Sequence, residues 1–186
     1  MRTLGWALLR SPAVDDRPGV TVRPDPPMAA PERESLRGWL DFHRATLAWK
    51  CDGLDDGELR RPSMSPSTLT LLGLVRHMAE VERHWFRRVI AGETIRHVWT
   101  DDWDFQAAYN ASESTRAEAF GAWRTEVDEA RRIERGVASL ENTFRVDAWD
   151  CDVTLRTILL HLHHDYARHN GHADLLREGL DGTVGS

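Results

Sequence analysis

The amino-acid sequence predicts an all-α fold, in which four long helices pack as a four-helix bundle. Four stretches of the chain repeat their apolar residues at the three- and four-residue spacing that marks one face of a helix. No stretch of useful length alternates apolar and polar residues as a strand does, and no internal repeat is visible. With 186 residues, 41% of them hydrophobic, the chain is long enough for one domain with a sizeable core.

Charge and cysteine content narrow the class of function. The formal net charge of -6 argues against binding to nucleic acid or to an anionic membrane surface. No apolar run approaches the roughly 20 residues that span a bilayer, and the apolar segment at the start is short for a signal peptide. Cys51 and Cys151 form no zinc-binding or redox pattern. These features predict a cytoplasmic protein with reduced, structural thiols.

The N-terminal segment looks different from the rest of the chain. Residues 1–30 contain five prolines and no helical period, so they are predicted to form an irregular tail that is disordered or lies on the surface. Met28 is an alternative to Met1 as the start, because organised sequence begins just after it. A first helix is expected from Pro31, a residue suited to the first helical position, to Cys51. Its core stripe consists of Leu36, Leu40, His43 and Leu47.

A second helix is expected from Thr68 or Thr70 to Ala91, after a connector over residues 54–67 that contains glycine and proline. His77 lies at the edge of the apolar stripe of this helix. By itself, such a residue is either a histidine packed into the core or a ligand that faces a bound group. The stripe consists of Leu71, Leu74, Val75, Met78, Val81, Trp85 and Val89.

Residues 93–112 show no helical period and interleave aromatic residues with aspartates. A loop of this length either covers a functional pocket or plugs one end of the bundle. A third helix is expected to begin at Ser114 or Thr115, because Thr115 and Glu118 fit a capping box. The aromatic residues of the loop are Trp99, Trp103, Phe105 and Tyr109, and the stripe of the third helix consists of Phe120, Trp123, Val127, Ala130 and Val137.

The fourth helix, expected to be capped by Asp152 or Thr154, carries the candidate site. Asp165 and His169 lie inside its apolar stripe, one turn apart and pointing the same way. A buried ionised carboxylate is costly unless it is compensated, so the two residues are either metal ligands or a hydrogen-bonded pair. The other histidines of this helix lie at the margins of the stripe or away from it. The stripe consists of Leu155, Ile158, Leu159, Leu162, Tyr166, Ala173, Leu176 and Leu180, and the other histidines are His161, His163, His164 and His172.

Two segments carry a family resemblance. They are Leu71-Leu-Gly-Leu-Val-Arg-His-Met-Ala-Glu-Val-Glu82, and Asp165-Tyr-Ala-Arg-His-Asn-Gly-His-Ala-Asp174 with the Leu-Leu-Arg-Glu178 that follows it. With them, the chain resembles the DinB superfamily, and more closely its actinobacterial branch related to mycothiol-dependent maleylpyruvate isomerase. The resemblance implies a DinB-like four-helix bundle of up-down-down-up type over residues 31–183, with long loops.

The resemblance also implies a divalent metal ion held by one histidine of the second helix and by a pair of residues on the fourth. In this sequence those positions are His77, Asp165 and His169. Close relatives have glutamate where Asp165 stands, and the shorter aspartate must draw the helices together or bind through water. Three protein ligands leave coordination positions open for water or substrate. Zinc, nickel and iron all accept this set of nitrogen and oxygen ligands.

The function that the resemblance implies is metal-dependent activation of a small thiol, similar to mycothiol, or of another nucleophile. The thiol would be transferred to an electrophilic substrate, or an isomerisation would follow. Arg168, His172 and Arg177 are candidates for contact with the ligands or the substrate. The alternative is a non-enzymatic metal-binding bundle, involved in a stress response or in an interaction as a homodimer.

Overall fold

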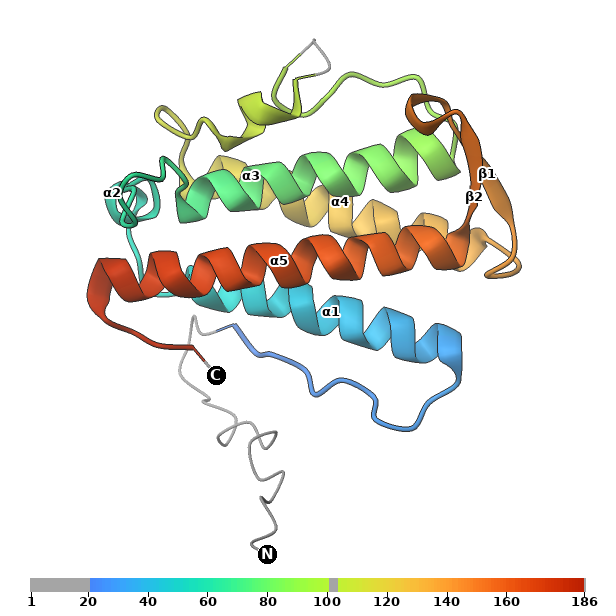
Figure 1. Cartoon of the computed structure of the whole chain (residues 1–186), viewed down its shortest axis with the longest axis horizontal. Helices are drawn as coiled ribbons and strands as arrows, with labels where there is room; N and C mark the ends of the chain where they lie inside the picture. The colour runs from blue at the N-terminus through green and yellow to red at the C-terminus, as the bar shows by residue number, and fades with distance from the viewer. Residues whose placement is uncertain (1–20, 101–103, 186) are drawn as a thin grey trace, which may run out of the picture.

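The computed structural model describes residues 21–100 and 104–185, and it shows the predicted four-helix bundle (Figure 1). Helices α1 and α5 run in one direction, and α3 and α4 run in the other, which is the up-down-down-up arrangement (Figure 1). Helix α1 packs mainly on α5, and α3 packs mainly on α4. The bundle helices are α1 (Glu32–Lys50), α3 (Leu71–Glu82) with its π-helical continuation η2 (Arg83–Ile90), α4 (Arg116–Gly136) and α5 (Leu155–Asp181).

The helix ends follow the local signals in the sequence. Thr115 and Glu118 form the capping box expected at the start of α4. Of the two predicted caps of α5, Thr154 is the residue whose side chain accepts the backbone N–H of Thr157. Helix α5 ends at Gly182, whose φ of 77° is a left-handed conformation that glycine adopts without strain.

Helix α3 is the central element of the fold, since all 12 of its residues are buried. One side packs in the bundle, and the segment that returns from η2 to α4 covers the other (Figure 1). This segment includes the 3-10 helix η3 (Phe105–Tyr109). Arg76 donates to the carbonyl of Ala108 at 2.9 Å, and Trp99 donates to the carbonyl of Arg76 at 2.8 Å. The aromatic segment therefore covers the side of α3, while Trp103 lies outside the described residues.

A buried hydrogen-bond network joins the four bundle helices. Arg44 of α1 donates two hydrogen bonds, at 2.8 and 2.7 Å, to Glu82 at the end of α3. Tyr166 of α5 donates to the same carboxylate at 2.7 Å, and Trp123 of α4 donates to the Tyr166 hydroxyl at 2.9 Å. Glu82 and Tyr166 have no solvent exposure. A buried carboxylate needs such partners, because desolvation disfavours its charge.

The structure also contains one short hairpin that the sequence pattern did not predict. An antiparallel hairpin joins α4 to α5, with strands β1 (Thr143–Val146) and β2 (Cys151–Thr154). Each strand has four residues, and only Val146 and Val153 are buried. Alternation over four residues is too short to stand out from a loop in the sequence. The connector before α3 also contains a single helical turn, α2 (Asp56–Leu59), which was not predicted.

The predicted N-terminal tail is described only from residue 21 onward, and residues 1–20 lie outside the described residues. Residues 21–30 form no helix or strand, and they run beside α1 (Figure 1). Arg23 lies over the rings of Phe42 and Trp49, at 5.0 and 4.9 Å from their centroids. Within the part of the chain that the structure describes, no helix combines the length and hydropathy that crossing a membrane requires.

We expect Glu82→Ala to lower the free energy of unfolding by about 3–5 kcal/mol, because it leaves the buried guanidinium of Arg44 without its partner. Urea denaturation followed by circular dichroism measures this change. As a control, Arg132→Ala removes an exposed ion pair with Glu129 and should change stability by about 0.5 kcal/mol or less. A loss below about 1 kcal/mol in Glu82→Ala would show that the network does not hold the bundle.

The stability of the fold should also depend on the protonation of His84. Burial, together with Arg88 and His97, lowers the pKa of His84 to about 4. An unfolded chain binds this proton near pH 6.5. The stabilisation from neutral His84 is therefore complete above about pH 6.5 and is lost as the pH falls toward 4.

Urea titrations between pH 7 and pH 4.5 test this dependence. We expect His84→Gln to lose roughly 2 kcal/mol less stability than the wild type over this range. The exposed His164 provides a matched control, and His164→Gln should keep the wild-type slope. Equal slopes for wild type and His84→Gln would contradict the prediction.

Candidate metal centre

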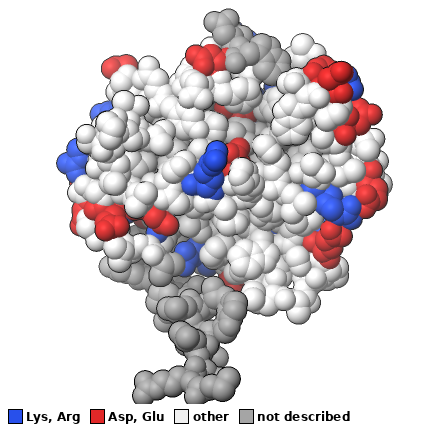
Figure 2. Space-filling view, viewed as in Figure 1, with Lys and Arg blue, Asp and Glu red and all other residues white. Residues whose placement is uncertain are grey.

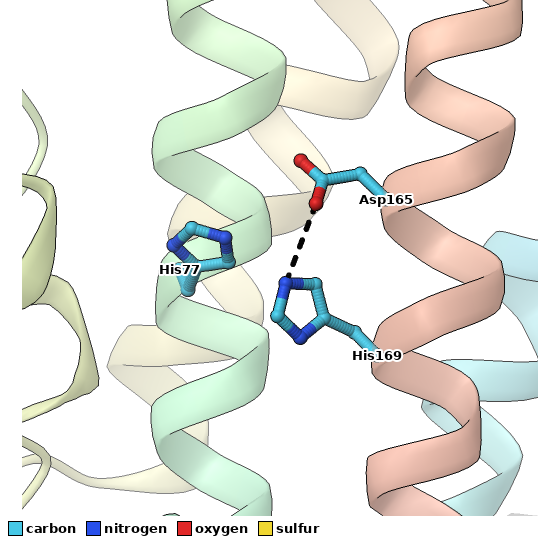
Figure 3. Close-up of side chains that lie close together, drawn as sticks. All are labelled: His77, Asp165 and His169. Atoms are coloured by element: carbon cyan, nitrogen blue, oxygen red, sulfur yellow. Dashed lines mark ion pairs between the residues drawn. The ribbon is translucent and has the colours of Figure 1, made fainter.

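Three side chains from two helices converge on one point beside α3. His77 comes from α3, and Asp165 and His169 come from successive turns of α5. Each offers one possible ligand atom, and these atoms all lie within 4.8 Å of one another. Figure 3 shows the three side chains directed into the same space between the two helices. Among the residues that the structure describes, no second group of three histidine, cysteine or acidic side chains meets this criterion.

The site is largely shielded from solvent. His77 is 9% exposed and His169 is 5% exposed, while the Asp165 side chain remains 20% exposed. Asp165 Oδ1 lies 3.5 Å from His169 Nε2 (Figure 3), which is longer than the roughly 2.7–3.2 Å of a good hydrogen bond. The geometry therefore does not favour a simple Asp–His hydrogen bond, and it leaves room between the donor atoms.

The protonation states suit a bound cation. Burial, with a smaller effect from His169, lowers the pKa of His77 to about 4, so this imidazole is neutral at pH 7. Burial by itself would raise the pKa of Asp165, but His169 and His77 outweigh it, and the pKa is lowered. A neutral imidazole and an ionised carboxylate are ligands of the kind that divalent transition metals take. The donor set of this structure therefore fits such an ion.

Aromatic contacts hold His77 in place. Its ring stacks on Tyr109, with centroids 4.4 Å apart and an interplanar angle of 15°, and it meets the His169 ring at 4.7 Å. The Nδ1 atom of His77 is buried and has no hydrogen-bond partner among the described residues. The stacking contacts, rather than a hydrogen bond from Nδ1, therefore orient this ring.

Tyr109 of the aromatic loop also belongs to the site, which its position in the sequence did not predict. Its hydroxyl lies 3.5 Å from Nε2 of His169, the nitrogen that also faces Asp165. Burial and the charge of Asp165 raise the pKa of Tyr109 to about 12, although Arg168 opposes the shift. The hydroxyl therefore stays protonated and can donate a hydrogen bond at the centre. The only signal for it in the sequence was the aromatic, acid-rich composition of its segment.

The other predicted contact residues lie in different surroundings. His172 is at the site, with Nδ1 at 3.4 Å from Nδ1 of His169. Arg168 is exposed on α5, and it has no ion-pair partner among the described residues. Arg177 instead lies at the end of α1, where it donates to the carbonyls of Lys50 and Asp52 at 3.1 and 2.7 Å. This bonding gives Arg177 a role in capping α1.

The remaining histidines of α5 are not part of this group of candidate ligands. His164 is exposed. His163 contacts the carbonyl of Leu36 at 2.9 Å, and its ring meets that of His43. His161 packs between Trp85 and Trp149.

The up-down-down-up bundle, with one histidine on α3 and an acid–histidine pair on α5, defines a protein of the DinB-like superfamily. The sequence matches the family model for mycothiol-S-transferase over residues 35–182, and the chain belongs to this family. No curated protein matches the chain significantly. The predicted superfamily and fold class are thus confirmed.

We expect the wild-type protein, reconstituted with zinc, nickel or iron and freed of excess metal, to retain about one equivalent of metal per chain. His77→Ala should lose most of this metal, because only two of the three ligands remain. His164→Ala, which changes an exposed histidine on the same helix as Asp165, serves as the control. Elemental analysis measures the content, and wild-type metal in His77→Ala would contradict the assignment.

Proposed function

We propose that this protein is a metal-dependent thiol S-transferase, which uses mycothiol or a similar small thiol and an electrophilic substrate. The observation that carries the proposal is the convergence of His77, Asp165 and His169 in a chain that belongs to the mycothiol-S-transferase family. We also propose that the protein acts in the cytoplasm and that it forms a homodimer.

The three side chains would supply two imidazole nitrogens and one carboxylate oxygen to a divalent cation, which would leave further coordination positions free. A divalent cation at this point would lower the pKa of a coordinated thiol and provide thiolate at neutral pH. Asp165 is the most exposed of the three candidate ligands, so a substrate would reach the centre from the side of Asp165. His77 and His169 are buried, so the centre is shielded from solvent on their side.

In the proposed reaction, Tyr109 and Arg168 would act on the reacting molecules. The protonated Tyr109 hydroxyl can donate a hydrogen bond to a group held beside His169. The guanidinium of Arg168 is exposed and available to a negatively charged substituent of the substrate. In a substitution, the thiolate would form a carbon–sulfur bond while the bond to the leaving group breaks and its electron pair departs with that group. In an addition, the π bond would break instead, and its electron pair would move to the neighbouring atom, which takes up the proton that the thiol released.

The surface around the centre favours a substrate with an uncharged body. Figure 2 shows that acidic and basic side chains lie mostly around the rim of the face formed by α3 and α5. The middle of this face is largely uncharged, apart from basic and acidic atoms side by side near its centre (Figure 2). An uncharged electrophile is thus not repelled, and its apolar surface is removed from water on binding.

A metal-stripping experiment separates a catalytic ion from a structural one. The core and the network around Glu82 do not include the three candidate ligands, so the bundle has its own source of stability. We therefore infer that removing the metal costs little stability and most of the activity. A structural ion would instead lower the melting temperature strongly.

We expect the metal-loaded wild type to consume mycothiol in the presence of a model electrophile, and chelation or His169→Ala to lower the rate at least 100-fold. The free thiol is measured over time with a colorimetric reagent, after correction for the uncatalysed reaction. His164→Ala should keep the wild-type rate, since this side chain is exposed and outside the centre. Absence of thiol consumption with every thiol and metal tested would refute the proposed function.

A further inference from the structure

A second feature near the candidate metal centre is a cavity of about 430 Å³ at the N-terminal end of α3. One wall is the connector that precedes α3, and the other is the end of η3 with the residues that follow it. A volume of this size accommodates a small organic molecule. None of the three candidate metal ligands lines the cavity.

Most of the residues that line the cavity have polar but uncharged side chains. Six of its 10 lining residues carry a hydroxyl or a carboxamide, and the only charged one is Arg60. Arg60 already donates to the carbonyl of Ser114 at 2.9 Å. The side chains of Thr68 and Gln106 are exposed and have no hydrogen-bond partner among the described residues. Both are therefore available to a ligand.

Hydroxyl and carboxamide groups both donate and accept hydrogen bonds, and this property matches the hydroxyls of a polyol. The few apolar lining residues, such as Pro62 and Leu69, can cover the C–H face of a saturated ring. The cavity suits other ligand classes less well. It has no carboxylate for an ammonium group, and the aromatic ring of Tyr109 is already stacked on His77.

Tyr109 connects the cavity to the metal centre. It lines the cavity, and its hydroxyl lies 3.5 Å from His169 Nε2. Along α3, Thr70 of the cavity precedes His77 by seven residues, which corresponds to about 10 Å of helix. One molecule of moderate length can therefore fill the cavity and reach the cation with its other end.

Gly73 allows this close arrangement. A Cβ atom at this position would lie 2.6 Å from the carbonyl oxygen of Tyr109 and 3.0 Å from Oγ1 of Thr70. The backbone that carries Tyr109 can thus approach α3 only because residue 73 lacks a side chain. The contact sets the position of one cavity wall relative to the helix that provides His77.

We infer that this cavity binds the neutral, polyhydroxylated part of the thiol cofactor, while the sulfur reaches the metal centre. The inference rests on the proposed function for the identity of the ligand. It adds a recognition site, separate from the metal ligands, that selects a polyol-bearing thiol over a simple one. Thr68 and Gln106 supply hydrogen bonds to the polyol, and Tyr109 forms the wall between the two parts of the ligand.

Binding of S-methyl mycothiol tests the inference without any turnover. Its sulfur cannot ionise, so the affinity measured by isothermal titration calorimetry reports on the rest of the molecule. S-methylcysteine, which lacks the polyhydroxylated part, is the matched ligand. Thr68→Val and Gln106→Leu remove one polar group each from exposed positions, where the fold should tolerate the change. Thr125→Val alters a threonine of α4 outside the cavity and serves as the control variant.

We expect S-methyl mycothiol to bind the wild type and Thr125→Val with similar affinity, and S-methylcysteine to bind at least ten-fold more weakly. Thr68→Val and Gln106→Leu should each weaken binding of S-methyl mycothiol roughly five-fold, the effect of one neutral hydrogen bond. No binding to the wild type, or equal binding to these two variants, would overturn the inference. Absence of thiol turnover with this binding pattern intact would instead count against the proposed function alone.

Discussion

The structure depends on one buried carboxylate, Glu82, which takes hydrogen bonds from two other helices of the bundle. Arg44 of α1 and Tyr166 of α5 donate to it directly, and Trp123 of α4 reaches it through Tyr166. Apolar packing is not directional and tolerates sliding of one helix along another. A hydrogen-bonded network with one member on each helix tolerates much less, because any slide would leave a buried charge without partners.

This constraint places the candidate metal centre. Asp165 is the neighbour of Tyr166 on α5, and His77 lies five residues before Glu82 on α3, or about 7 Å along the helix. The register that satisfies Glu82 therefore also sets the distance between His77 and the pair formed by Asp165 and His169. On the opposite side of α3, the returning segment brings Tyr109 against His77. The centre thus has two bundle helices as a rigid base and a loop as its cover, an arrangement that suits binding and catalysis.

Much of the fold and part of the site could be predicted from the sequence. The helical spacing of apolar residues and the capping residues predicted the bundle helices. Such signals, including the caps at Thr115 and Thr154, depend only on residues close together in the sequence. That Asp165 and His169 point the same way followed from their spacing on one helix. The family resemblance singled out His77, because spacing alone does not show which helices converge.

Other features could not be predicted from the sequence. The contacts of Tyr109 and the network around Glu82 depend on tertiary packing, and the hairpin strands are too short for a periodic signal. Arg177 was a candidate for contact with the ligands or the substrate, yet it donates its hydrogen bonds to carbonyl groups at the end of α1.

X-ray absorption spectroscopy of the metal-loaded protein tests the central claim most directly, since it reports on the atoms bound to the cation. We predict a first shell that includes two imidazole nitrogens and one carboxylate oxygen at about 2.0–2.2 Å. In the Asp165→Asn and His169→Ala variants, the corresponding oxygen or imidazole signal should disappear. A first shell of water oxygens alone, or an imidazole signal unchanged in His169→Ala, would show that these three side chains do not hold the ion.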